Sequence, residues 1–311
     1  MSPRRPLAAK PGTRPGTFRP DNILDFTVEA AEPQNLLDFL IGVMPDRKKT
    51  TVKDFLKHNQ VMVNGNVTTQ FDIPVAAGDT VAVNTTREFQ TFYSPRLKIV
   101  YEDNDIIVVY KGYGLLSMGT DKIKDGTAYS LLRDYLKRKD PRNKLFIVHR
   151  LDRDTSGLMM FAKTMQAKET MQHNWNNMVL ERRYVAVVTN GAPDPAEGEI
   201  RSYLAENAAH EVYSTPDPEK GQLAVTYYRT LRARGKYALV ELSLATGRKN
   251  QIRVHMKEAG HTIAGDRRYG APASPIHRLA LHAQTLRFVH PVTRRDMNFT
   301  TPVPAAFDKL V

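Results

Sequence analysis

The chemically richest stretch of the sequence is His149–Gly157, which reads HRLDRDTSG. It gathers the carboxylates of Asp152 and Asp154, two guanidinium groups and an imidazole in one short segment. A carboxylate beside an arginine stays ionised and can act as a nucleophile or as a general base. The stretch therefore predicts a catalytic loop. The alternative is a solvated network of surface ion pairs, which is common and contributes little stability.

The flanking residues indicate how this loop is held. Leu145–Val148 precedes it and Leu158–Ala162 follows it, and both runs are apolar. Short apolar runs of this length are typical of buried strands. We expect the charged segment to lie at the end of a sheet, where rigid strands on both sides position a functional loop.

Two further segments supply side chains that suit the same chemistry. Leu180–Val188 begins with basic residues and continues into a strand pattern that contains Tyr184. The run after Gly247 predicts a helix that carries Arg253 and stops near Gly260.

The string HRLDRDTSGL resembles the central motif of the RluA-like pseudouridine synthases, where the aspartate at the position of Asp152 is catalytic. The similarity continues, in order, from about Leu97 to the end of the chain. Its other landmarks are Tyr184 after a basic residue, Thr246–Arg253 (family pattern T-G-R-x-H-Q-I-R), Gly265–Gly270 and Leu281–Pro291. Asn250 stands where the family usually has His, and Gly112 replaces the Pro of a K-P-x-G-L segment at Lys111–Leu116.

The resemblance implies an α+β fold, with a mixed, mainly antiparallel central sheet and flanking helices. It implies that the enzyme breaks the bond from ribose to the base nitrogen, turns the base and bonds ribose to carbon 5. We expect Asp152, Arg253 and Tyr184 to be catalytic. Arg253 would orient the Asp152 carboxylate through two hydrogen bonds, and Tyr184 would stack on the uracil ring. Attack on the sugar, attack on the base and elimination all remain open. No cofactor or metal is expected.

The target uridine must leave the RNA stack, which costs a few kcal/mol. We expect Arg150 to fill the gap left by the flipped base and Arg248 to bind RNA. His149 would contact phosphate or support the loop.

Residues 23–86 predict a second, smaller RNA-binding domain. Their two short helices, and a turn at Asn64-Gly65 between strand-forming residues, resemble the S-four-type RNA-binding module. Lysines every fourth residue share one helical face. The predicted RNA face consists of Arg47, Lys48, Lys49, Lys53 and Lys57. The other interpretation is a solvated lysine stripe.

Composition sets wider bounds. The formal net charge of +12 favours a polyanionic partner such as RNA. The chain has no cysteine, which excludes thiol catalysis and disulfides. It shows no membrane-spanning run, and we expect a cytoplasmic monomer. We divide it into a disordered basic tail (1–22), the small module (23–86), a linker (87–96) and an α+β catalytic domain (97–311), in which residues 190–222 form an extended surface excursion.

Three other functions compete with ribosomal RNA pseudouridine formation. The target could be transfer RNA. Asp152 and Asp154 could be the paired carboxylates of a hydrolase, either a glycosidase or a magnesium-dependent nuclease. The basic tail and small module alone would fit a non-catalytic RNA-binding protein. Five histidines invite a metal site, but their spacing fits no tight ligand pattern. We assign to packing or RNA contacts His255, His261, His277, His282 and His290.

Overall fold

The computed structural model of the protein describes residues 23–29, 32–86, 88–89, 92, 94–271 and 276–311. The chain divides between Thr91 and Phe92 into two compact units, and each is described by itself. The predicted tail (1–22) lies outside the described residues, as do residues 87, 90, 91 and 93 of the predicted linker.

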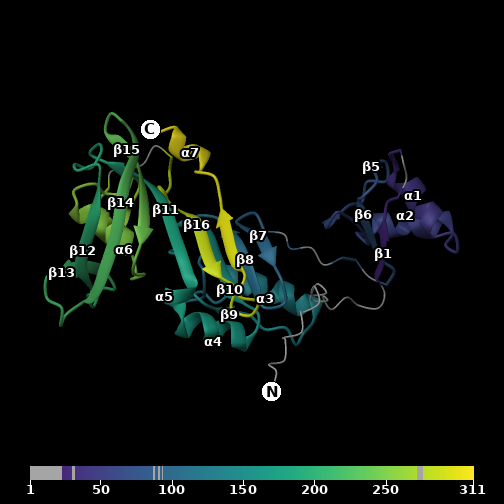
Figure 1. Cartoon of the computed structure of the whole chain (residues 1–311), viewed down its shortest axis with the longest axis horizontal. Coiled ribbons are helices and arrows are strands. Elements are labelled where there is room, and N and C mark those ends of the chain that lie inside the picture. Colours follow the sequence, from purple (N-terminus) through teal and green to yellow (C-terminus); the bar gives the residue numbers. More distant parts are fainter. Residues whose placement is uncertain (1–22, 30–31, 87, 90–91, 93, 272–275) are drawn as a thin grey trace, which may run out of the picture. The chain divides into compact units, whose positions relative to one another are not determined.

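In the first unit, two helices pack on a small antiparallel sheet (Figure 1). Val52, Phe55 and Leu56 are buried because they share one face of the second helix, α2. Asn64 and Gly65 have φ angles of 49° and 80°, as a tight hairpin turn requires. The elements are β1 (Ile23–Thr27), β2 (Gln34–Asn35), α1 (Leu36–Val43), α2 (Lys49–Lys57), β3 (Val61–Val63), β4 (Asn66–Val67), β5 (Pro74–Val75) and β6 (Thr80–Asn84).

The second unit is built on one large sheet. Its strand order is β13 (Val212–Thr215), β12 (Glu197–Glu206), β14 (Gln222–Arg234), β15 (Tyr237–Leu244), β11 (Val179–Thr189), β16 (Leu281–Val289), β10 (Ser156–Ala162), β8 (Ile106–Lys111) and β7 (Leu97–Glu102). β17 (Asp296–Thr300) pairs with β16, and β9 (Phe146–Ile147) pairs with β10. Of the pairings between the described strands, β10 with β16 is parallel and the others are antiparallel. The predicted fold class, α+β with a mixed and mainly antiparallel sheet, is confirmed.

Helices cover both faces of the sheet around β8 and β10. On one face Met159 packs in a cluster with Leu132 of α3 (Ala128–Lys139). On the other face Met160 packs in a cluster with Met171 of α4 (Met165–His173), which is followed by α5 (Trp175–Met178). A strand covered on both faces can have apolar residues at every position, which explains the continuous apolar run Leu158–Ala162 in β10.

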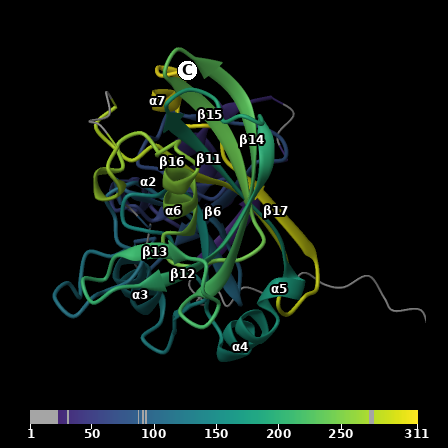
Figure 2. The same cartoon turned by 90° about the vertical axis from the view of Figure 1, so that its left-hand side faces the viewer.

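The helix that carries Arg253 is α6 (Gln251–Glu258), and it lies against β13 and β14 (Figure 2). Ile252 and Met256 are one turn apart and enter the core formed with β11, β15 and α7 (Ala305–Asp308). Gly260 follows the helix with a φ of 80°, as the predicted stop requires.

One sequence prediction about the fold is wrong. Residues 190–222 do not form a surface excursion, because they contain β12 and β13 of the large sheet. Glu197, Glu199 and Arg201 alternate with less exposed residues along β12. Such alternation is typical of a strand with one face in solvent, and the abundance of Pro, Gly and Glu in this segment hid it.

Among the described residues, no helix has both the length and the hydropathy needed to span a membrane.

Candidate active site

The segment His149–Thr155 forms the predicted loop, between the short strand β9 and the buried strand β10. His149 ties its start to the sheet, since Nε2 accepts the backbone N–H of Met160 at 3.0 Å. Its ring also lies 5.2 Å from that of Trp175, measured between centroids. Burial, with a smaller effect of the Arg182 charge, lowers the pKa of His149 to about 3. The imidazole is therefore neutral, and these contacts correspond to loop support, one of its two predicted roles.

The loop is also held by Lys111, a residue to which sequence reasoning gave no role. Its side chain is fully buried at the end of β8. Nζ donates to the carbonyl oxygens of Leu115 at 2.8 Å and Arg153 at 3.0 Å. Burial lowers the pKa of Lys111 to about 7. Ser117 adds a second clamp, because its Oγ accepts the N–H of Leu151 at 3.1 Å. The sequence feature that could have indicated this role is a lysine at the end of an apolar strand, directly before a Gly-rich bend.

Arg253 and Asp152 meet as predicted, but not in the predicted geometry. Nη1 of Arg253 lies 3.5 Å from Oδ2 of Asp152, and the two side chains are 13% and 25% exposed. The prediction that Arg253 donates two hydrogen bonds to Asp152 is wrong, because a single nitrogen makes the contact. The guanidinium instead donates two bonds of 2.7 Å to Asp266, from Nε and Nη2. Burial opposes a charge here, but the Asp266 contacts raise the pKa of Arg253, which is therefore charged.

A cavity of about 180 Å³ opens in front of this pair. Tyr184 on β11 and Leu281 on β16 form part of its wall, and Asp152 lines it as well. Burial raises the pKa of Tyr184, the Arg182 charge partly opposes this effect, and the Asp152 charge adds to it, so the phenol keeps its proton. The structure thus brings together around one cavity the predicted residues Asp152, Tyr184, Arg253, Arg150 and Arg248.

The segment that leads into α6 is fixed by Arg182. Its Nη2 donates to the carbonyl oxygens of Leu244 at 3.3 Å and Thr246 at 3.2 Å. A Cβ atom on Gly247 would lie 2.5 Å from Nη1 of Arg182, so a side chain at this position would require the guanidinium group to shift. Asn250, which replaces the usual histidine, has a φ of 53°, and asparagine adopts this conformation more readily than most residues.

The predicted RNA face lies in the first unit. Lys49, Lys53 and Lys57 are exposed along α2, beside the face that carries its buried residues. Arg47 and Lys48 are exposed just before the helix. The structure therefore brings these cations to one exposed surface of that unit, and their role in RNA binding stays a prediction.

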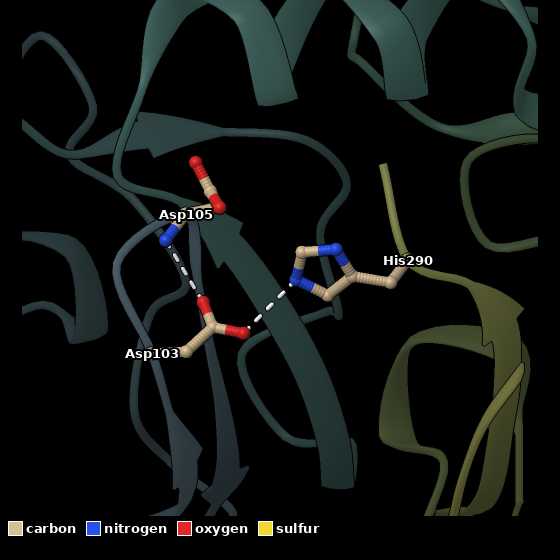
Figure 3. Close-up of side chains that lie close together, drawn as sticks. All are labelled: Asp103, Asp105 and His290. Atoms are coloured by element: carbon tan, nitrogen blue, oxygen red, sulfur yellow. Dashed lines mark hydrogen bonds and ion pairs between the residues drawn. The ribbon is translucent and has the colours of Figure 1, made fainter. Parts of the chain in front are cut away.

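Asp154, the second carboxylate of the hydrolase alternative, is exposed and is not among the residues that line the cavity beside Asp152. Among the described residues, the group with geometry suited to a metal ion is Asp103, Asp105 and His290 (Figure 3). Nδ1 of His290 accepts the N–H groups of Val292 and Thr293, so Nε2 carries the proton. It donates to Asp103 at 2.9 Å (Figure 3). This histidine therefore has no free lone pair for a metal. It links the turn at Asp103 to the turn at Val292 and Thr293.

Comparisons with known proteins agree with this arrangement. The sequence profile of the RNA pseudouridylate synthase family matches residues 105–258. Ribosomal large subunit pseudouridine synthase D of Escherichia coli is 32% identical over 295 residues, 89% of this chain and 90% of the relative. YlyB of Bacillus subtilis, an uncharacterized RNA pseudouridine synthase, is 34% identical over 299 residues, 93% and 97% of the two chains.

The fold is also found among solved structures. Human RNA pseudouridylate synthase domain containing 4 superimposes with a TM-score of 0.56, at 24% sequence identity, over 68% of this chain and 90% of the human chain. Given the extent of the similarity to the bacterial relatives, the chain belongs to the RluA-like family of RNA pseudouridine synthases, which are isomerases.

Proposed function

We propose that this enzyme isomerises uridines of large-subunit ribosomal RNA to pseudouridine, with Asp152 as the nucleophile. The observation that carries the proposal is the partly exposed side chain of Asp152, which lines the same cavity as Tyr184 and Arg253. The Escherichia coli relative is named for the large ribosomal subunit and is similar over most of both chains, which supports this class of RNA.

The proposed reaction needs no co-reactant. The Asp152 carboxylate forms a covalent bond to the nucleotide. When that bond later breaks, the carboxylate is released in its original form. Meanwhile the bond between ribose C1′ and N1 breaks, the uracil turns, and a bond from C1′ to carbon 5 forms. Carbon 5 loses one proton and N1 gains one, so substrate and product have the same composition. Arg253 keeps the attacking carboxylate oriented, since a guanidinium stays charged even when partly buried.

Binding of the flipped nucleotide falls to the cavity wall. Tyr184 offers its ring to the uracil, and stacking of this kind contributes roughly 1–3 kcal/mol per base. The exposed Arg150 fills the space that the base leaves in the RNA helix. Arg248, at the rim of the cavity, binds a backbone phosphate.

We propose that residues 23–86 form an S-four-type module that grips structured RNA. Its support is the exposed row of Lys49, Lys53 and Lys57 on α2, with Arg47 and Lys48 beside it. Cations arranged along one helical face match the spacing of charges on a nucleic-acid backbone better than scattered ones do. In this proposal residues 97–311, which begin with β7, form the domain that catalyses the reaction.

The test is conversion of uridine in unmodified ribosomal RNA by the purified protein, without added metal or cofactor. Asp152→Asn should lower the rate by roughly 10³-fold or more while the affinity for RNA stays within about twofold. Asp154→Asn is the matched control, because this neighbour does not line the cavity, and it should convert uridine at the wild-type rate.

Three results would contradict the proposal. Full activity of Asp152→Asn would remove the nucleophile assignment. Activity that disappears with EDTA would favour the metal-dependent hydrolase chemistry. Conversion of uridine in transfer RNA but not in ribosomal RNA would show that the substrate is wrong.

A further inference from the structure

The family landmark Gly265–Gly270 contains a carboxylate with no part in the mechanism above. Asp266 lies just after α6 and its side chain is fully buried. Both of its oxygens are used by Arg253, from Nε and from Nη2, at 2.7 Å each. A parallel pair of charge-assisted bonds fixes the plane of the guanidinium as well as its position.

The rest of the guanidinium is equally restrained. Its carbon lies 4.9 Å from the centroid of the Tyr269 ring. Nη1 donates to Oδ1 of Asn250 at 3.1 Å, and Nδ2 of Asn250 donates in turn to the Tyr269 hydroxyl at 3.1 Å. Only Nη1 also points towards Asp152, at 3.5 Å. Asp266 and Asn250 therefore decide which nitrogen reaches the nucleophile.

This arrangement matters for a nucleophilic carboxylate. An arginine that clamps both carboxylate oxygens takes one lone pair of each and stabilises their negative charge, which makes both oxygens weaker nucleophiles. An arginine that contacts one oxygen through one nitrogen orients the group and leaves the other oxygen free. In the structure the contact to Arg253 is made by Oδ2, and the carboxylate is a quarter exposed.

We propose that Asp266 is a positioning residue for pseudouridine formation, which holds the Arg253 fork away from Asp152 so that one carboxylate oxygen stays free to attack. Asn250 is its partner and directs Nη1. The inference rests on the proposed role of Asp152. Without the Asp266 charge, the Arg253 fork turns to the nearest remaining carboxylate, which is Asp152.

The experiment compares Asp266→Asn with Asp296→Asn in single-turnover conversion and RNA binding. Asp296 on β17 pairs with Arg287 on β16 through the same two guanidinium nitrogens, but both side chains are exposed. Asp266→Asn should lower the rate by roughly 10²-fold and leave the RNA dissociation constant within twofold. Asp296→Asn should change neither. A folded Asp266→Asn protein with the wild-type rate would overturn the proposal.

A double-mutant cycle separates positioning from a general structural effect. If Asp266 acts through Arg253, then Asp266→Asn should have no further effect on the rate once Arg253 is replaced by Met. The thermal midpoint should also be lower for Asp266→Asn than for the double variant, because the single change leaves a buried arginine without its partner. An additive loss of rate in the Arg253→Met background would contradict the inference.

Asn250→Gly provides a second test if Asp266→Asn does not fold. Glycine accepts the positive φ of this position, so only the side-chain contacts are lost. The rate should fall about three- to tenfold, as for one hydrogen bond, and the loss should vanish in the Arg253→Met background. A wild-type rate for Asn250→Gly would count against the proposal. Inactivity of the wild-type protein on ribosomal RNA would instead count against the proposed substrate, while the thermal cycle would still report the Asp266–Arg253 pairing.

Discussion

Ser156 and His282 face each other across the parallel pairing of β10 and β16, with Oγ of the serine 2.8 Å from Nδ1 of the histidine. Ser156 also accepts Nη2 of Arg278 at 2.6 Å, and Nε2 of His282 lies 2.9 Å from Oγ1 of Thr301. Because Ser156 directly follows the loop His149–Thr155, this chain of bonds joins the end of that loop to the centre of the sheet. The imidazole must be neutral to accept from the serine.

This pairing predicts a loss of stability in acid. Burial, with a smaller effect of the Arg278 charge, lowers the pKa of His282 from 6.5 to about 4. The unfolded chain therefore binds a proton that the folded chain does not, and stability falls as the pH drops from 6.5 towards 4. By pH 5 the contribution of His282 to this loss should approach about 2 kcal/mol. Urea unfolding at pH 7 and pH 5 measures it.

His282→Gln should reduce the difference in unfolding free energy between the two pH values, even if the variant is less stable at both. Part of the difference should remain, because burial also lowers the pKa of His255 to about 4 and that of His149 to about 3. An unchanged pH dependence in His282→Gln would contradict the prediction.

Gly157 should tolerate no side chain. Its φ is 120°, and a Cβ atom would lie 2.1 Å from the backbone oxygen of Ala283 on β16. Gly157→Ala should therefore destabilise the protein by at least about 3 kcal/mol. Gly235→Ala is the control, since its φ is 55° but nothing lies within 4 Å of the added atom. It should cost about 1 kcal/mol, and equal denaturant midpoints for the two variants would refute the argument.

Tyr184 should act mainly through its ring. Tyr184→Phe keeps the stacking surface and should retain conversion within about tenfold of the wild type, whereas Tyr184→Ala should lose about 10²-fold. Single-turnover rates at saturating RNA give the comparison. Tyr227→Ala serves as the control, because this exposed tyrosine on β14 does not line the cavity. A rate for Tyr184→Ala close to that of Tyr227→Ala would show that the ring is dispensable.

The lysine row on α2 should set the salt dependence of RNA binding. Replacing Lys49, Lys53 and Lys57 by Ala should weaken binding and lower the slope of log affinity against log salt by up to about 2. Replacement of the same residues by Arg keeps the charges and should keep the slope. If the alanine variant binds with the wild-type slope, the row is a solvated surface and not an RNA face.

The sequence by itself determined the local structure around the chemistry. The apolar runs on both sides of His149–Thr155 predicted strands, and β9 and β10 lie there. The helical pattern after Gly247 placed Arg253 on α6. These features depend on the spacing of apolar residues and on the backbone preferences of a few neighbouring residues. Both can be read directly from the amino-acid sequence. The similarity of whole motifs to the family then identified the reaction.

Only the tertiary structure decided which partner each charged group takes. Arg253 had two carboxylates within reach, and the turn after α6 brings Asp266 into the better geometry, so that Asp152 receives a single nitrogen. Lys111 likewise finds one of its acceptors, the carbonyl oxygen of Arg153, on a loop distant in sequence. Such choices depend on where separate segments meet and on how far water is excluded there, and neither is written in the local sequence.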